Sequence, residues 1–323
     1  MNPPTPRLTV ATLAELESTT GFEWFVTAPR NELTFPERFR ELMYRSRKEL
    51  RALEPQLPRV STLLQRRFLK HSAWVADVLG NFDEAATFQR RLGNIKEADW
   101  QLFQASMARG MASFLKPNQI VGALEPLDVH QGVWVALSFV KEVEEQCQPS
   151  VLVARKSGGN WQCLAQRTLS PQATNAHLKV LSGEIVIVQD RLGGSWQPTE
   201  VNCYRLHQGA LQETTSLFSE HGVRLRKFDG RWTLSTFHCI GYCPCHGEQP
   251  RWLEVFQQGK NGWQLASAKY PELFEDYPRQ IRSLLKRYPN DDVLPAYLHW
   301  TERLLQGKTV GPPPQKHAQK IDT

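Results

Sequence analysis

Three cysteines and two histidines of this 323-residue chain lie within nine consecutive positions that read HCIGYCPCH. Thiolate and imidazole groups are the ligands that zinc ions and iron–sulfur centres take from proteins. The spacing predicts a metal site built from Cys239, Cys243, Cys245 and His246, with His238 as a substitute ligand. Structural zinc is the expected ion, since six cysteines in a chain without a secretion signal argue against a disulfide framework.

Part of this segment resembles an iron–sulfur pattern. Residues 243–247 read CPCHG and resemble the second box of a Rieske protein, Cys-Pro-x-His-Gly, whereas the first box, Cys-x-His, does not occur in the chain. Three alternatives stay open for the same thiols: a zinc-pinned loop, a metal- or thiol-dependent redox site, and a loop of free thiols.

Other catalytic signatures are absent from the sequence. It has no Gly-x-Ser-x-Gly elbow, no glycine-rich phosphate loop and no His-Glu-x-x-His zinc motif. The sequence therefore favours a non-catalytic interaction or scaffold protein with a protein partner over an enzyme. A redox enzyme that uses the cysteine–histidine segment is the alternative.

Positive charge concentrates between Pro36 and His71. This window holds ten Lys and Arg against four acids, a net charge of +6 that equals the net charge of the whole chain. Apolar residues recur in it at helical spacing, so the arginines lie on helices. A basic helix face attracts phosphates or an acidic partner. A second alternative function is therefore that helices 37–71 bind nucleic acid or an acidic partner through Arg45, Arg47 and Arg51. The competing interpretation is that these basic residues form an ordinary solvent-exposed helix face.

The bulk composition is that of a globular protein, with 41% apolar and 22% charged residues. No apolar run approaches the roughly 18 residues needed to span a bilayer. The N-terminus lacks the basic-then-apolar pattern of a secretory signal. We therefore expect a basic, cytoplasmic protein without a membrane span.

Short alternating runs fill the middle of the chain. Val133, Val135, Leu137 and Phe139 are spaced to share one face of a strand. Further on, strands lead repeatedly into a glycine followed by tryptophan, at Gly159-Asn160-Trp161, Gly194-Ser195-Trp196, Gly230-Arg231-Trp232 and Gly262-Trp263. Glycine at a tight turn and a large aromatic at the next strand start are typical of β-hairpins. These G-x-W repeats predict an antiparallel hairpin meander, arranged as a propeller-like module, a sandwich or a barrel.

Two Gly-Asn pairs organise the preceding helices. The sequence predicts a helix that ends near Leu79, a short helix over 82–92 and a third that begins near Ile95. Glycine suits the left-handed end of a helix and asparagine caps the next one. Glu84 and Glu97, three residues after each Asn, complete the pattern of a capping box.

The expected fold class is α+β, with helices before and after the hairpin meander. The expected divisions are an extended arm (1–35), a helical domain (36–118), a β-hairpin repeat domain (130–270) with its Cys/His loop (238–246), C-terminal helices (271–306) and a disordered tail (307–323).

Overall fold

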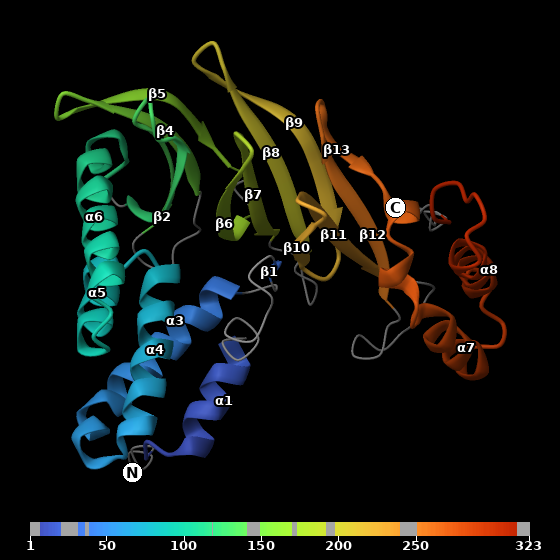
Figure 1. Ribbon diagram of the computed structural model, residues 1–323, viewed down its shortest axis with the longest axis horizontal. Coiled ribbons are helices and arrows are strands. Elements are labelled where there is room, and N and C mark those ends of the chain that lie inside the picture. The colour runs from blue at the N-terminus through green and yellow to red at the C-terminus, as the bar shows by residue number, and fades with distance from the viewer. Residues whose placement is uncertain are drawn as a thin grey trace, which may run out of the picture. The chain divides into compact units, whose positions relative to one another are not determined.

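The computed structural model describes residues 7–20, 32–35, 39–117, 119–140, 149–169, 173–191, 198–239 and 251–314 (Figure 1). Within these ranges the chain forms seven α-helices and thirteen β-strands, which confirms the α+β class. None of these helices is long and apolar enough to cross a bilayer. The chain divides into two compact units: unit 1 comprises 1–31 and 35–216, and unit 2 comprises 32–34 and 217–323.

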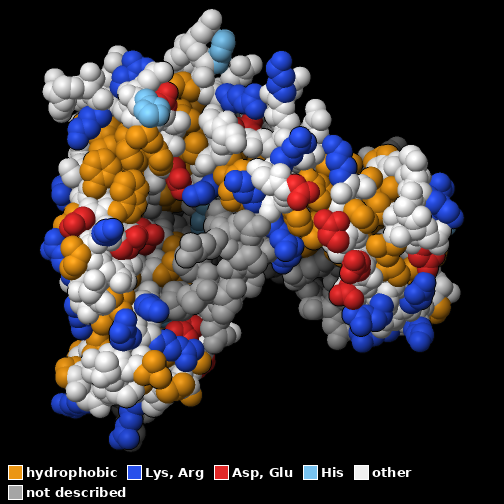
Figure 2. Space-filling model, in the orientation of Figure 1, with side chains coloured by type: hydrophobic (Ala, Val, Ile, Leu, Met, Phe, Trp, Pro, Cys, Tyr) orange, Lys and Arg blue, Asp and Glu red, His pale blue; other side chains and the backbone are white. Residues whose placement is uncertain are grey.

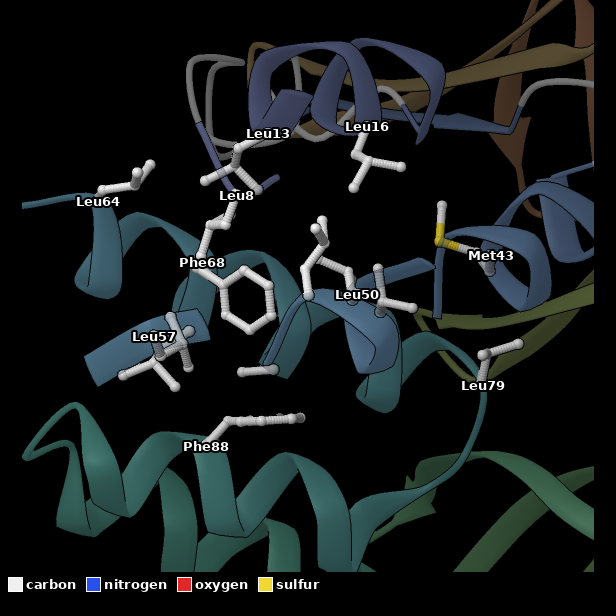
Figure 3. Close-up of a cluster of buried hydrophobic side chains, with 14 residues drawn as sticks. Leu8, Leu13, Leu16, Met43, Leu50, Leu57, Leu64, Phe68, Leu79 and Phe88 are labelled. Atoms are coloured by element: carbon white, nitrogen blue, oxygen red, sulfur yellow. The ribbon is translucent and has the colours of Figure 1, made fainter. Parts of the chain in front are cut away.

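Unit 1 begins with helices that share one buried core. They are α1 (Val10–Thr20), α3 (Phe39–Leu53), α4 (Thr62–Val78) and α5 (Phe82–Arg91). Helix α6 (Ile95–Met111) follows them in the chain and belongs to a second buried cluster. The core forms because leucines at helical spacing on α3 and α4 face α1 and α5. Figure 3 shows Phe68 of α4 pointing into it, between Leu13 of α1 and Phe88 of α5.

Helix α1 lies where the sequence predicts an extended arm. Its buried Glu17 accepts hydrogen bonds from Nε of Arg67 on α4, at 2.8 and 2.9 Å. Thr20 Oγ1 lies 3.0 Å from Nε2 of the buried His71. Burial, with the nearby Arg67 charge, lowers the pKa of His71 to about 3, so the ring is neutral at pH 7. These partners are some fifty residues away in the chain, which is why the local sequence does not reveal the helix.

The two Gly-Asn pairs separate α4, α5 and α6 as predicted. Gly80 and Gly93 both have positive φ, +73° and +81°. The predicted asparagine caps are wrong, because neither Asn81 nor Asn94 makes a side-chain capping hydrogen bond.

The preceding helix ends explain the missing caps. The main-chain N–H of Asn81 donates to the carbonyl of Ala76 at 2.8 Å, which closes α4 in a Schellman motif. The corresponding N–H of Asn94 donates to Gln89 at 2.9 Å. A capping box needs that same N–H for the glutamate at the third helical position. The carboxylate of Glu84 is therefore left to find another partner.

The strands form three open sheets. The first contains β2 (Gln119–Asp128), β3 (Val133–Val140), β4 (Ser150–Ser157) and β5 (Asn160–Thr168); the second contains β6 (Ala173–Leu181), β7 (Glu184–Arg191), β8 (Thr199–His207) and β9 (Ala210–Ser219). The third contains β1 (Glu32–Phe35), β10 (Val223–Phe228), β11 (Arg231–Cys239), β12 (Arg251–Gly259) and β13 (Gly262–Leu265). Apart from β1, each sheet is a meander of consecutive strands, and the described strands include no closed barrel.

Two-residue turns join several of these strands. The pairs Gly158-Gly159, Ser182-Gly183, Gln208-Gly209 and Asp229-Gly230 all have positive φ at both positions. That geometry belongs to type I′ turns, whose twist matches that of the flanking strands. The hairpins expected before Trp161, Trp232 and Trp263 are present, whereas Trp196 lies outside the described residues.

The central strands of the first sheet, β3 and β4, are buried on both faces. Val133, Val135, Leu137 and Phe139 share one face as predicted, and they contribute to a core that also contains Ile185 and other residues of the second sheet. The alternate residues of β3 and β4 pack instead with α5 and α6. Helices α5 and α6 therefore share a core with the first sheet, and the helices predicted over 36–118 do not stand apart from the strands as a separate domain.

Strand β2 lies before the predicted start of the β region at 130. It contains Gly122 and Pro126, two residue types that disfavour a central strand. Proline is tolerated here because β2 is at the edge of its sheet.

Unit 2 combines the third sheet with α7 (Tyr277–Arg287) and α8 (Leu294–Leu305), which confirms C-terminal helices. Trp252 of β12 is buried at its centre, with its ring 4.2 Å from Tyr297 and 5.3 Å from Trp300. Trp300 Nε1 donates to the carbonyl of Gly311 at 2.9 Å, so the first residues of the expected disordered tail pack on α8.

Gly80 offers a direct test of how α5 is placed on the sheet. A Cβ atom at Gly80 would lie 2.5 Å from Cα of Gly122 on β2, whereas one at Gly93 would meet nothing within 4 Å. Both glycines have positive φ, so Gly93→Ala controls for backbone strain, worth about 1–2 kcal/mol. We expect Gly80→Ala to lower the free energy of unfolding by about 2 kcal/mol more than Gly93→Ala does, in urea denaturation. Equal losses would contradict this packing.

Candidate functional site

Unit 1 contains a groove of about 680 Å³ beside the start of α5, a size typical of ligand-binding sites. We call it the arginine groove. Its charged lining residues are Arg47, Arg51, Glu54, Asp83, Glu84 and Arg109. They come from α3, α5, α6 and the 3-10 turn after α3. Two of the three arginines that the sequence singles out as binding residues therefore line a cavity.

Glu84 is the shared partner of those two arginines. Nε and Nη2 of Arg47 donate to its Oε2 atom at 2.9 and 2.6 Å. Nε of Arg51 donates to the other oxygen, Oε1, at 3.1 Å. Arg47 and Arg51 stand one helical turn apart, so one carboxylate reaches both. Glu84 also lies in the first turn of α5, where the helix dipole favours a negative charge.

Two more ion pairs border the groove. Arg109 of α6 donates to Asp83 at 3.1 Å, and Arg91 donates to Glu54 at 2.5 Å. The groove lining thus holds three arginines and three acids. On the face of unit 1 shown in Figure 2, blue and red side chains likewise lie close together.

Two guanidinium groups keep donors for a ligand. The Nη atoms of Arg51 and the Nη2 atom of Arg109 make no hydrogen bond to any residue that the structure describes. These side chains are 57% and 65% exposed. A guanidinium group binds a carboxylate or phosphate through several N–H groups at once. The groove can therefore accept an anionic group without first losing every ion pair.

The floor of the groove is apolar. Phe82 and Phe88 of α5, Ala105 of α6 and Val121 of β2 are buried there, and Ile120 is half-buried. The contact between Gly80 and Gly122 holds the start of α5 close to β2. A ligand in the groove would thus meet charged rims and an apolar floor.

Arg45, the third predicted binding residue, lies outside the groove. It pairs with Glu49 one turn further along α3, at 3.3 Å, with side chains 75% and 43% exposed. Such exposed pairs contribute little to stability. Arg45 therefore serves as a control for charge changes at Arg47 and Arg51.

Most of the predicted metal site lies outside the described residues. Cys243, Cys245 and His246 lie outside the described residues, and only the backbone of Cys239 is described, at the end of β11. Cys239 pairs with Arg251 of β12, so the two ends of the cysteine–histidine loop are adjacent. Over the described ranges, no group of three or more His, Cys, Asp or Glu could hold a metal ion.

His238, the predicted substitute ligand, has other contacts. Its Nε2 atom lies 3.0 Å from Thr236 Oγ1 and 3.3 Å from Glu254 Oε2. Its ring also lies near Phe218, at 6.5 Å between centroids. His238 would have to leave the hydroxyl and the carboxylate to bind a metal through Nε2.

A second polar cluster in unit 1 has a structural role. Gln101 Nε2 on α6 donates to Asp77 Oδ1 on α4 at 2.8 Å, and burial raises the pKa of Asp77 to about 6. Nearby, Lys179 of β6 donates to Glu125 of β2 at 2.6 Å. These contacts connect α4 with α6 and the first sheet with the second.

No family model matches this chain, and neither a curated protein nor a solved structure matches it.

Proposed function

We propose that this protein is a non-catalytic interaction protein that binds an acidic protein segment in the arginine groove. The observation that carries the proposal is the pair of exposed guanidinium groups, Arg51 and Arg109, with unused donors over an apolar floor. Carboxylate side chains of a partner would bind the arginines, and an apolar side chain between them would cover the floor.

The groove suits a protein segment better than nucleic acid. A nucleic-acid backbone is bound by many cations along an extended surface. Here Glu54, Asp83 and Glu84 lie among the arginines and would repel a row of phosphates. A single acidic side chain can meet Arg51 or Arg109 without approaching all three acids.

The hairpin sheets fit a scaffold role in this proposal. We infer that their G-x-W turns repeat a common unit, in a propeller-like or sandwich arrangement, and present loops at the sheet ends. Cytoplasmic location belongs to the same proposal. It is supported by Cys163, which is a free thiol.

Charge reversal at Arg51 tests the proposal. The probe is a fluorescently labelled oligoglutamate peptide containing one leucine, and the measurement is fluorescence anisotropy at two salt concentrations. We expect saturable, salt-sensitive binding by the wild type and a loss of at least about tenfold in affinity for Arg51→Glu. Arg45→Glu makes the same charge change outside the groove, so its affinity should stay within about twofold of wild type.

Two outcomes would contradict an acidic protein ligand. One is an equal loss for Arg45→Glu and Arg51→Glu, which indicates a diffuse charge effect. The other is binding of a single-stranded oligonucleotide but not of the peptide, which favours the nucleic-acid alternative.

We propose in addition that Cys239, Cys243, Cys245 and His246 hold a structural zinc ion. The support is the pairing of β11 with β12 as far as Cys239 and Arg251, which closes the loop that carries the other three residues. Zinc bound by thiolates and imidazole would tie such a loop without catalysis.

Metal analysis tests the zinc proposal. We expect about one zinc per chain in protein purified without added metal, and loss of both zinc and thermal stability in Cys243→Ser. Cys163→Ser is the control, because Cys163 lies on β5 and is not one of the predicted ligands. A metal-free wild type would contradict the proposal. Visible absorbance from a bound cluster would instead support the redox-enzyme alternative.

A further inference from the structure

We propose that Glu84 is an internal competitor for the anion site, and that an acidic segment binds by taking its place on Arg51. This inference rests on the proposed function and specifies how the same groove is regulated. The side chains already have the arrangement of a bound state, since the Glu84 carboxylate pairs with guanidinium groups that a ligand carboxylate would use.

The two halves of the Glu84 interaction differ. Oε2 accepts two hydrogen bonds from Arg47, at 2.6 and 2.9 Å, and the Arg47 side chain is only 23% exposed. Oε1 accepts one hydrogen bond from Arg51, at 3.1 Å, and the Arg51 side chain is 57% exposed. Solvent screens the second contact more than the first, so it is the easier one to replace.

Displacement at Arg51 leaves no buried charge without a partner. Glu84 keeps both hydrogen bonds to Arg47 when a ligand carboxylate takes over Arg51. It also keeps its favourable place in the first turn of α5. Arg51 exchanges one carboxylate for another and can offer the ligand its Nη atoms as well.

Local structure explains why Glu84 is available for this role. The capping-box position it occupies is unused, because the main-chain N–H of Asn81 is donated to Ala76. Glu84 therefore has no competing contact with its own helix end and turns to α3. Its carboxylate lowers the affinity for an acidic ligand but keeps Arg47 and Arg51 in position when no ligand is present.

The test compares Glu84→Gln with Glu49→Gln in the same oligoglutamate titration. Both changes remove one negative charge that pairs with an arginine of α3, but Glu49 pairs with Arg45 outside the groove. We expect Glu84→Gln to bind the peptide about 3- to 10-fold more tightly than wild type. Glu49→Gln should stay within about twofold.

Glu84→Asp keeps the negative charge that Glu84→Gln removes, so it separates the loss of the arginine contacts from the change in net charge. Its shorter side chain cannot reach both arginines as Glu84 does, so we expect tighter peptide binding than wild type here too. If Glu84→Gln does not fold, Glu84→Asp alone tests the inference. Thermal denaturation of each variant shows whether it is folded.

The competitor role is overturned if Glu84→Gln and Glu84→Asp bind no more tightly than wild type, or if Glu49→Gln gains as much as they do. If the wild type then still loses the peptide on Arg51→Glu, the proposed function stands and this inference alone fails. If neither the wild type nor either Glu84 variant binds the peptide, both fail.

Discussion

The carboxylate of Glu84, shared between Arg47 and Arg51, is the interaction on which the candidate site depends. It joins α3 to the start of α5 and sets the guanidinium groups along one wall of the groove. The same carboxylate holds these helices together, since separating them would break its three charge-assisted hydrogen bonds to Arg47 and Arg51. The same contact thus organises the groove and occupies it.

Backbone geometry places that carboxylate. Gly80 turns the chain at positive φ and lies against Gly122, so α5 begins directly beside β2. The Schellman closure of α4 uses the N–H of Asn81 and leaves Glu84 without a capping partner. A side chain that would ordinarily stabilise its own helix therefore stabilises the contact between two helices. The apolar floor follows from the packing of α5 and α6 on the first sheet.

Local features of the structure could be predicted, whereas long-range ones could not. The end of α4, both ends of α5 and the start of α6 follow from two glycines. The buried face of β3 follows from the alternation of apolar residues from Val133 to Phe139. The partner of Glu84 does not follow from its neighbours, because it depends on which turn of α3 comes to lie beside α5. Helix α1 was missed for the same reason, since Arg67 and His71 hold it from far along the chain. Arg47 and Arg51 were expected at a binding surface, but their charges are paired with Glu84 rather than offered as an open basic face. The cysteine–histidine site stays a prediction.

The central claim is that Glu84 and the arginines act as one coupled unit, and a double-mutant cycle measures this directly. Arg47→Met and Glu84→Gln, singly and together, give a coupling free energy from urea unfolding that is independent of any ligand. We predict a coupling of about 1–3 kcal/mol for this half-buried pair, against less than about 0.5 kcal/mol for the exposed Arg45–Glu49 pair measured in the same way. A coupling for Arg47 and Glu84 that is no larger than that of Arg45 and Glu49 would contradict the account.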